Sequence, residues 1–255
     1  MINQSAVDLA QLTSIAKAFA HLPYENVTKI LKDAKSTTVR EKLRKEEEVI
    51  ADHLRWNTGG TCFSLCNALN AVLKNSGFDP FIAMGDMHYG RNIHCAVIIP
   101  LNGGRYLIDP GYLLHHPMLL PESAYETRLK THMNTVVVRS EDDITFSLYT
   151  IESSQLKWRY RLHAVPISDE EFVRHWIHSF SLNSMEHVTL SRMNEKGRLY
   201  FRKGRLDQVN ESQRIRSEFH DSAAHELSEI FGLPADLISN ARDVLLARPR
   251  LIGKI

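Results

Sequence analysis

The chain has 255 residues, of which 43% are hydrophobic, so it is long and apolar enough to bury a substantial core. Its 31 Lys and Arg residues balance 30 Asp and Glu residues, which argues against nucleic acid or an anionic membrane as a partner. No apolar run reaches the ~18 residues needed to cross a bilayer, and the opening MINQSAVDLAQL lacks the features of a signal peptide. We therefore expect a globular cytoplasmic protein.

The cysteine content argues against both a disulfide scaffold and a metal site. Three cysteines are too few for a scaffold, and an odd number fits a reducing compartment with a free reactive thiol. A zinc site built on Cys62, Cys66 and His94 would lack a fourth ligand, and its cysteine spacing is wider than that of the tightest fingers. We expect no metal. The pattern of a phosphate-binding loop is also missing after the glycine pair that precedes Cys62.

The first 76 residues predict a small helical bundle. Apolar residues keep helical spacing from Val7 to Phe19, and a second, shorter helix ends near Lys35. A third helix is expected from Thr38 to Leu54, with the charged run over residues 42–48, KLRKEEE, as its solvated face.

The fourth predicted helix begins at Cys62, directly behind Gly59 and Gly60, and Gly77 ends it. The glycine pair can adopt backbone angles closed to other residues, and its small size lets a ligand approach the first amides of the helix. A thiol in the first turn lies at the positive end of the helix dipole, which favours the nucleophilic thiolate. One buried helical face is predicted from the spacing of the apolar residues Cys62, Leu65, Cys66, Leu69, Val72 and Leu73.

Residues 77–165 predict an antiparallel sheet or small barrel. Turn-forming segments LNGG and SEDD separate short β-rich runs, and the short connections favour a meander. The predicted strands are Phe78–Met84, Ile93–Ile99, Arg105–Ile108, Val136–Arg139, Ile144–Tyr149 and Lys157–His163.

Residues 166–255 predict a mixed α/β region, so that the whole chain falls in the α+β class. Ser168 and Glu171 form a capping box at the start of a helix in SDEEFVRHWIHSF. The remaining predicted elements are strands Val188–Arg192 and Arg198–Phe201, followed by helices Ala223–Phe231 and Ala235–Ala247.

A cysteine nucleophile needs a base and a group that orients the base. His94 opens an apolar strand, and Asp109 ends the next one, so the hairpin between the two strands should bring the pair together. Alternation along the first of these strands directs Cys95 to the opposite face from His94. We therefore expect Cys95 in the core, away from the site.

At these residues the sequence resembles the arylamine N-acetyltransferases. The Gly-Gly-Thr-Cys run at residues 59–62, the strand residue His94 and the Asp-Pro-Gly run at residues 109–111 match the order and approximate spacing of that family's pattern. The segment LPYENV at residues 22–27 is similar to another family motif, and VPISDEEF, GRLYFR and IFGL resemble later landmarks. The resemblance covers nearly the whole chain.

The resemblance implies a fold of three domains with a core like that of the cysteine proteases: a helical bundle (1–76), a β domain (77–165) and an α/β lid (166–255). It also implies an enzyme with a Cys-His-Asp triad that takes acetyl from acetyl-CoA as co-substrate and passes it to an arylamine or hydrazine by ping-pong kinetics. In this family a serine-rich segment binds the coenzyme, and the serines that align with it here are Ser179, Ser181 and Ser184.

The chain departs from the family pattern at several positions. Thr58 replaces an arginine, so the ion pair that this arginine would make with Glu25 should be lost. Cys66 stands where an asparagine is usual, DPGYL replaces the usual sequence after the aspartate, and Leu182 replaces the proline of the serine-rich segment. These changes leave open a longer acyl thioester or one bound to an acyl carrier protein, as in the related amide synthases.

Two further classes remain open: a cysteine hydrolase or transglutaminase-like enzyme, and a binding protein without activity. A basic cluster on the predicted hairpin of the last region would suit coenzyme phosphates or an acidic carrier protein, although such residues commonly serve solubility alone. Within it Arg198 and Arg202 share a strand face. The cluster consists of Arg192, Lys196, Arg198, Arg202, Lys203 and Arg205.

Overall fold

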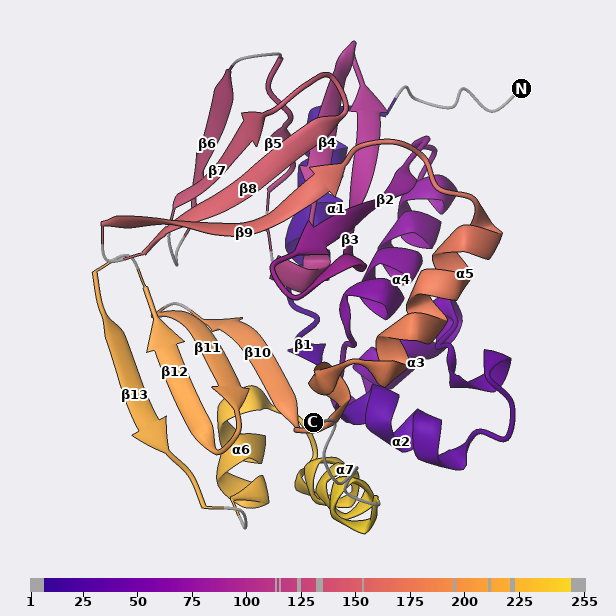
Figure 1. Cartoon of the computed structure of the whole chain (residues 1–255), viewed down its shortest axis with the longest axis vertical. Coiled ribbons are helices and arrows are strands. Elements are labelled where there is room, and N and C mark those ends of the chain that lie inside the picture. Colours follow the sequence, from indigo (N-terminus) through magenta and orange to yellow (C-terminus); the bar gives the residue numbers. More distant parts are fainter. Residues whose placement is uncertain are drawn as a thin grey trace.

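The structure is a computed structural model and describes residues 7–248, apart from residues 113, 115, 123–124, 132–134, 153, 195, 211 and 221–222. Helices pack beside an eight-stranded antiparallel sheet that curls into a near-closed barrel, and a second antiparallel sheet of five strands lies below it with two helices (Figure 1). This is the α+β architecture predicted from the sequence. Within the described part, no helix combines the length and hydropathy that a membrane-spanning segment needs.

The N-terminal helices differ from the prediction at one place. Residues 38–54 do not form a single helix: a short 3-10 turn, η1, spans Arg40–Lys42, and the next helix begins only at Glu46. The backbone is extended at Leu43 and Lys45, and Arg44 between them is 3% exposed rather than lying on a solvated face. The helices are α1 (Leu9–Phe19), α2 (Val27–Lys35), α3 (Glu46–Trp56) and α4 (Cys62–Asn75).

The barrel strands follow the order β5-β4-β3-β2-β9-β8-β7-β6. The LNGG segment forms the predicted hairpin between β3 and β4, with Asn102 (φ 51°) and Gly103 (φ 78°) in the left-handed region that such a turn requires. β5 is too short, and β6 too charged, to be recognised in the sequence. The strands are β2 (Phe81–Met87), β3 (Gly90–Leu101), β4 (Gly104–Ile108), β5 (Met118–Leu119), β6 (Glu126–Lys130), β7 (Thr135–Ser140), β8 (Thr145–Glu152) and β9 (Gln155–His163).

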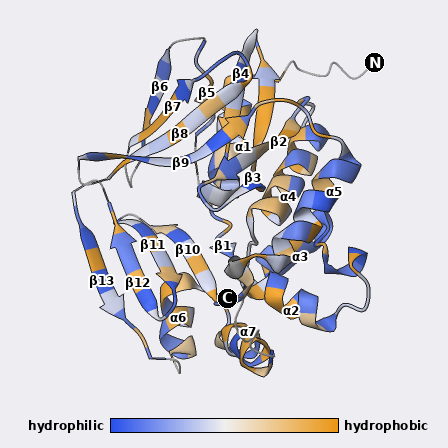
Figure 2. Cartoon of the chain, viewed as in Figure 1, coloured by the Kyte–Doolittle hydropathy of each residue, from blue (hydrophilic) through white to orange (hydrophobic). Residues whose placement is uncertain are grey.

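Strand β3 joins the barrel to the helices because both of its faces are apolar. Ala96 and Ile98 belong to the core inside the barrel, whereas Cys95 and Val97 belong to the core shared with α4. The alternation predicted for this strand is therefore confirmed. In Figure 2 hydrophobic residues run along the inner strands, while much of β12 and β13 in the second sheet is hydrophilic.

The second sheet draws on both ends of the chain. Val27 and Ile30 of α2 share its core with Leu190 and Phe201, whereas the later helix α5 packs its Phe172 on the helical side. The boundaries of the three expected domains, at residues 76 and 165, therefore stay a prediction. The elements are β1 (Tyr24–Glu25), β10 (Thr189–Asn194), β11 (Gly197–Arg202), β12 (Arg205–Val209) and β13 (Arg214–Glu218), with helices α5 (Asp169–His178), α6 (Ala224–Phe231) and α7 (Ala235–Ala247).

Candidate active site

The loop before Cys62 is held by the two-residue strand β1. The backbone N–H of Gly60 donates to the carbonyl of Pro23 at 3.3 Å, and the N–H of Glu25 donates to the carbonyl of Gly60 at 3.0 Å. A Cβ at Gly59 would lie 2.0 Å from the Pro23 oxygen, and one at Gly60 would lie 2.2 Å from Ser64 Oγ. Neither glycine has a left-handed backbone angle. The pair is therefore needed for close approach, not for the special angles that the sequence suggested.

Arg44 fixes the same loop from the side of α3. Its guanidinium donates to the Gly59 carbonyl at 2.5 Å and to Thr28 Oγ1 at 2.8 Å. Nη1 lies 3.9 Å from the fully buried carboxylate of Glu25, and Nη2 bonds Asp52 at 2.7 Å. Thr58 cannot make the ion pair to Glu25 that an arginine would make there, and Arg44 supplies a cation to this carboxylate from a different position in the chain.

His94 and Asp109 meet as the hairpin predicts. His94 Nε2 lies 2.8 Å from Asp109 Oδ2, which also accepts a hydrogen bond from the hydroxyl of Tyr160 at 2.7 Å. The other oxygen, Oδ1, accepts from the backbone N–H of Tyr112 at 3.1 Å. The carboxylate is 0% exposed, so these three donors replace the water that it loses on burial.

The thiol of Cys62 contacts both His94 and Cys95 at the start of α4. A hydrogen bond from Cys95, together with the hydrogen bond and charge of His94, outweighs burial and holds the pKa of Cys62 well below that of a free thiol. Burial opposes the charged form of His94, but the charge and hydrogen bond of Asp109, together with Cys62, raise the pKa of the ring well above its usual value. The site therefore favours a thiolate beside an imidazolium.

Cys95 lies in the core, as expected, but not away from the site. β3 passes beneath the first turn of α4, so side chains from both strand faces reach Cys62. Cys66 is held below them, since its Sγ donates to the carbonyl of Cys95 at 3.2 Å. Burial raises the pKa of Cys66, which leaves Cys62 as the reactive thiol of the three.

Gly111 completes the floor of the site. A Cβ at this position would lie 3.1 Å from Cys62 Cβ, 3.1 Å from His94 Cε1 and 3.2 Å from Asp109 Oδ1. The Asp-Pro-Gly run thus brings the backbone against all three candidate residues.

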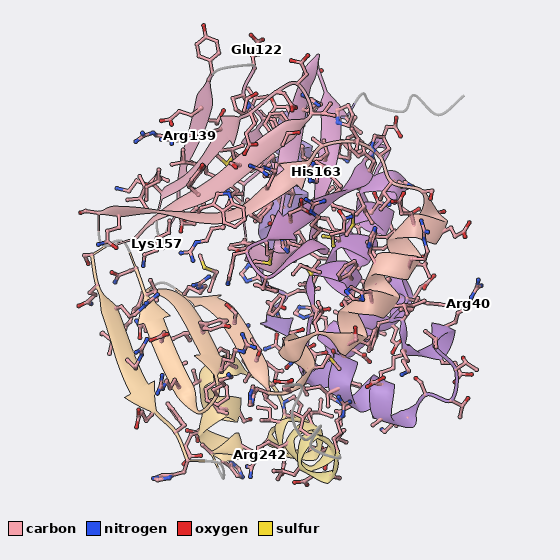
Figure 3. All side chains as sticks on the ribbon, in the orientation of Figure 1. Arg40, Glu122, Arg139, Lys157, His163 and Arg242 are labelled. Atoms are coloured by element: carbon pink, nitrogen blue, oxygen red, sulfur yellow. The ribbon has the colours of Figure 1, made fainter. Side chains whose placement is uncertain are left out.

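A cavity of about 360 Å³ opens above Cys62 and His94, between the helices, the barrel and the second sheet. Figure 3 shows side chains of the second sheet and of the barrel projecting toward each other across this space. The predicted shared face of Arg198 and Arg202 is confirmed, since both line the cavity beside Tyr200. Arg159 of β9 and Arg214 of β13 also line it.

Only two of the three predicted coenzyme serines reach this cavity. Ser179 and Ser184 line it, and Ser179 Oγ accepts a hydrogen bond from Lys29 and donates to the carbonyl of Trp176. Ser181 is exposed and donates to the carbonyl of His178 at 2.8 Å. Their role in coenzyme binding stays a prediction. Among the residues that the structure describes, no three His, Cys, Asp or Glu side chains are grouped to hold a metal ion.

Comparison with known proteins identifies the family. A model of the N-acetyltransferase family matches residues 8–238, which is most of the chain. The chain belongs to the arylamine N-acetyltransferase family. As a member of this family it is an N-acetyltransferase. No curated protein matches the sequence.

Solved arylamine N-acetyltransferases share the fold at low sequence identity. The Mycobacterium smegmatis enzyme is 21% identical, with a TM-score of 0.75 over 96% of this chain and 95% of its own. The Mycobacterium tuberculosis enzyme is 15% identical, with a TM-score of 0.77 over 93% of each chain. The Bacillus cereus enzyme, described as having a unique Cys-His-Glu triad, is 19% identical, with a TM-score of 0.69 over 90% of this chain and 92% of its own. In the present N-acetyltransferase the carboxylate on the histidine is an aspartate.

The substitution Arg44→Met should destabilise the fold of this N-acetyltransferase and distort the loop before Cys62. Removal of one partner from a buried ion pair leaves the Glu25 carboxylate uncompensated, so we expect a loss of about 3–5 kcal/mol in the free energy of unfolding. Urea unfolding of the wild type and of each variant measures this free energy. Arg40→Met is the matched control, because Arg40 is exposed and projects away from the body of the molecule (Figure 3). Equal stability of the two variants would contradict the role assigned to Arg44.

Alkylation by iodoacetamide should be confined to Cys62 and should persist in mild acid. A lowered thiol pKa keeps the thiolate present as the pH falls, so the rate should change little between pH 8 and pH 6. In His94→Asn the imidazolium is lost and the pKa of Cys62 rises, so the rate at pH 6 should drop about tenfold or more and recover in alkali. Mass spectrometry locates the adduct. A wild-type rate that climbs tenfold per pH unit from 6 to 8 would refute the ion pair.

Proposed function

We propose that this N-acetyltransferase carries acetyl from acetyl-CoA to the amino group of an arylamine or hydrazine through an acyl-enzyme on Cys62. The observation that supports this most directly is the contact of Cys62 with His94, which Asp109 holds at the floor of the cavity. The nucleophile, the base and the group that orients the base are all within reach of a bound thioester.

In the first half-reaction the thiolate of Cys62 attacks the carbonyl carbon of the thioester. Negative charge develops on the carbonyl oxygen, and the backbone N–H groups at the start of α4 are suitable donors to it, since the first intrahelical bond there runs only from Leu65 to Thr61. The C–S bond to the coenzyme then breaks, and the imidazolium of His94 gives its proton to the departing thiolate.

In the second half-reaction the amine attacks the acyl-enzyme. The neutral imidazole of His94 removes the proton from the nitrogen, and Cys62 leaves as a thiolate. Asp109 acts as a positioning residue, because its carboxylate holds the ring and stabilises the imidazolium each time that it forms. Because the coenzyme leaves before the amine reacts with the acyl-enzyme, the kinetics are ping-pong.

The arginine-lined wall of the cavity supports a coenzyme A thioester as donor. Arg198, Arg202 and Arg214 lie on the second sheet, and Arg159 lies opposite them on β9. Guanidinium groups bind phosphate through paired charge-assisted hydrogen bonds, and coenzyme A carries several phosphate groups. The phosphopantetheine arm of an acyl carrier protein presents only one, so the wall favours the free coenzyme.

The decisive experiment is intact mass spectrometry after brief incubation with acetyl-CoA and no acceptor. The protein should gain one acetyl group, and Cys62→Ala should gain none. An acetyl adduct on Cys62→Ala would refute the nucleophile. An unmodified parent that accepts acyl groups from an acyl carrier protein would favour the amide synthases, and release of free acetate would favour a hydrolase.

Replacement of Arg198 and Arg202 together by alanine should raise the KM for acetyl-CoA about a hundredfold or more, because charge-assisted hydrogen bonds contribute about 1.5–3 kcal/mol each. The kcat should change little, since neither side chain acts on the reacting carbonyl. Arg205→Ala is the control, because Arg205 is exposed on the neighbouring strand β12 and does not line the cavity around Cys62. Steady-state kinetics with a saturating amine give the KM and kcat of the wild type, of the double variant and of Arg205→Ala. An unchanged KM would remove these arginines from donor binding.

A further inference from the structure

Lys29 of α2 is a buried cation in the wall of the cavity that holds Cys62. It is only 5% exposed, and its Nζ donates to the carbonyl of Ser179 at 3.0 Å and to Ser179 Oγ at 2.6 Å. The ammonium lies 4.3 Å from the centre of the Phe180 ring. Among the described residues, no carboxylate lies within 4 Å of Nζ.

The charged groups around Lys29 compensate its charge only in part. Asp33, one turn further along α2, is engaged by Lys42 and Arg248, each at 2.7 Å. Burial lowers the pKa of Lys29 to about 8, against the opposing influence of Cys62, Asp33 and, more weakly, Cys95. The side chain is therefore still mostly protonated at neutral pH, and a buried ammonium without a counter-ion is unfavourable.

We propose that Lys29 binds a carboxylate carried by the reacting part of the substrate, either on the acceptor amine or on the transferred acyl group. An ammonium has three N–H donors, and Ser179 accepts two of them, so a carboxylate in the cavity would take the third and neutralise the charge. This subsite rests on the proposed function, since it presumes that acyl transfer takes place at Cys62.

The position of Lys29 separates this subsite from the arginine-lined wall. The arginines come from the second sheet and from β9, whereas Lys29 comes from α2 and is held by Ser179, directly after α5. Its charge acts directly on Cys62, whose pKa it helps to lower. The anion that Lys29 binds therefore belongs beside the reacting centre, not at the phosphate end of a coenzyme.

The test compares substrates that differ only in charge. For the acceptor, kcat/KM is measured with acetyl-CoA and either 4-aminobenzoate or its methyl ester. For the acyl group, the rate at which Cys62 gains mass is measured with malonyl-CoA and with acetyl-CoA. Lys29→Met should lower the ratio of charged to neutral substrate about tenfold in one of these arms. The ratio is the readout, because Lys29 also acts on Cys62 and any effect there is common to both substrates. The affected arm identifies the source of the carboxylate.

Lys35→Met is the matched control, because Lys35 is exposed at the end of the same helix and should leave both ratios unchanged. Ratios that Lys29→Met leaves unaltered in both arms would overturn the proposal. A general fall in activity with constant ratios would do so as well, since it would mean that Lys29 only holds Ser179 in place.

The wild-type protein gives a second test that does not depend on the folding of a variant. In the affected arm, the rate with the charged substrate divided by the rate with the neutral one should fall as the pH rises through about 8, because Lys29 then loses its proton. Cys62, Cys95 and His94 titrate near the same cavity, but their protonation affects both members of a substrate pair and cancels in the ratio. The other charged groups near Lys29 are Asp33 and its partners Lys42 and Arg248. A ratio that stays constant from pH 6.5 to 9.5 in both arms would overturn the proposal.

Failure of the proposed function is recognised separately. If the wild-type protein is not acylated by acetyl-CoA, the proposed function fails and the kinetic arms cannot be run. Calorimetry then measures the affinities of 4-aminobenzoate and its methyl ester for the wild type and for Lys29→Met, which decides whether Lys29 binds a carboxylate. Selective loss of affinity for the acid in the variant supports it, and equal affinities overturn it.

Discussion

The buried carboxylate of Asp109 is the constraint on which the site depends. A carboxylate without any exposed surface is tolerated only if hydrogen bonds replace its water, and here the donors come from separate parts of the barrel: His94 from β3, Tyr160 from β9 and Tyr112 from the turn after β4. β2 lies between β3 and β9 and pairs with both. The register of the barrel therefore sets the base, since a slip by one residue would turn His94 or Tyr160 to the opposite face.

The nucleophile is positioned by a second set of contacts that is independent of the barrel. Strand β1 binds the glycine loop through Gly60 on one side and strand β10 on the other, with Tyr24 opposite Ser191. The same two residues therefore connect the loop before Cys62 to the sheet that carries the arginine-lined wall. Arg44 holds this arrangement from below, through the carbonyl of Gly59 and the carboxylate of Glu25. Because β1 contacts both the loop before Cys62 and the second sheet, a shift of the sheet would displace the nucleophile.

The sequence predicted what is local. Helical and strand periodicities located most elements, and the short hairpin between β3 and β4 was enough to pair His94 with Asp109. Contacts between segments that lie far apart in the chain could not be predicted from the sequence. Tyr160 lies 51 residues from Asp109, although the charged residues that alternate around it in KWRYRLH do indicate a side chain directed into the barrel. Arg44 was missed because a charged run is normally exposed, and only the fold shows that Glu25 needs a cation there.

The charges around Cys62 also bear on the order of events in the reaction. In the resting site the thiolate of Cys62, the imidazolium of His94 and the carboxylate of Asp109 carry one net negative charge, and Lys29 lies close enough to stabilise it. Acylation makes Cys62 a neutral thioester and, because His94 gives its proton to the coenzyme, leaves the single negative charge on Asp109. Cys62, the group that opposes the burial of Lys29 most strongly, is then no longer charged. Lys29 then loses the partial stabilisation that the thiolate gave it. An acceptor that brings its own carboxylate is consequently favoured on the acyl-enzyme more than on the free enzyme, which couples departure of the coenzyme to binding of the second substrate.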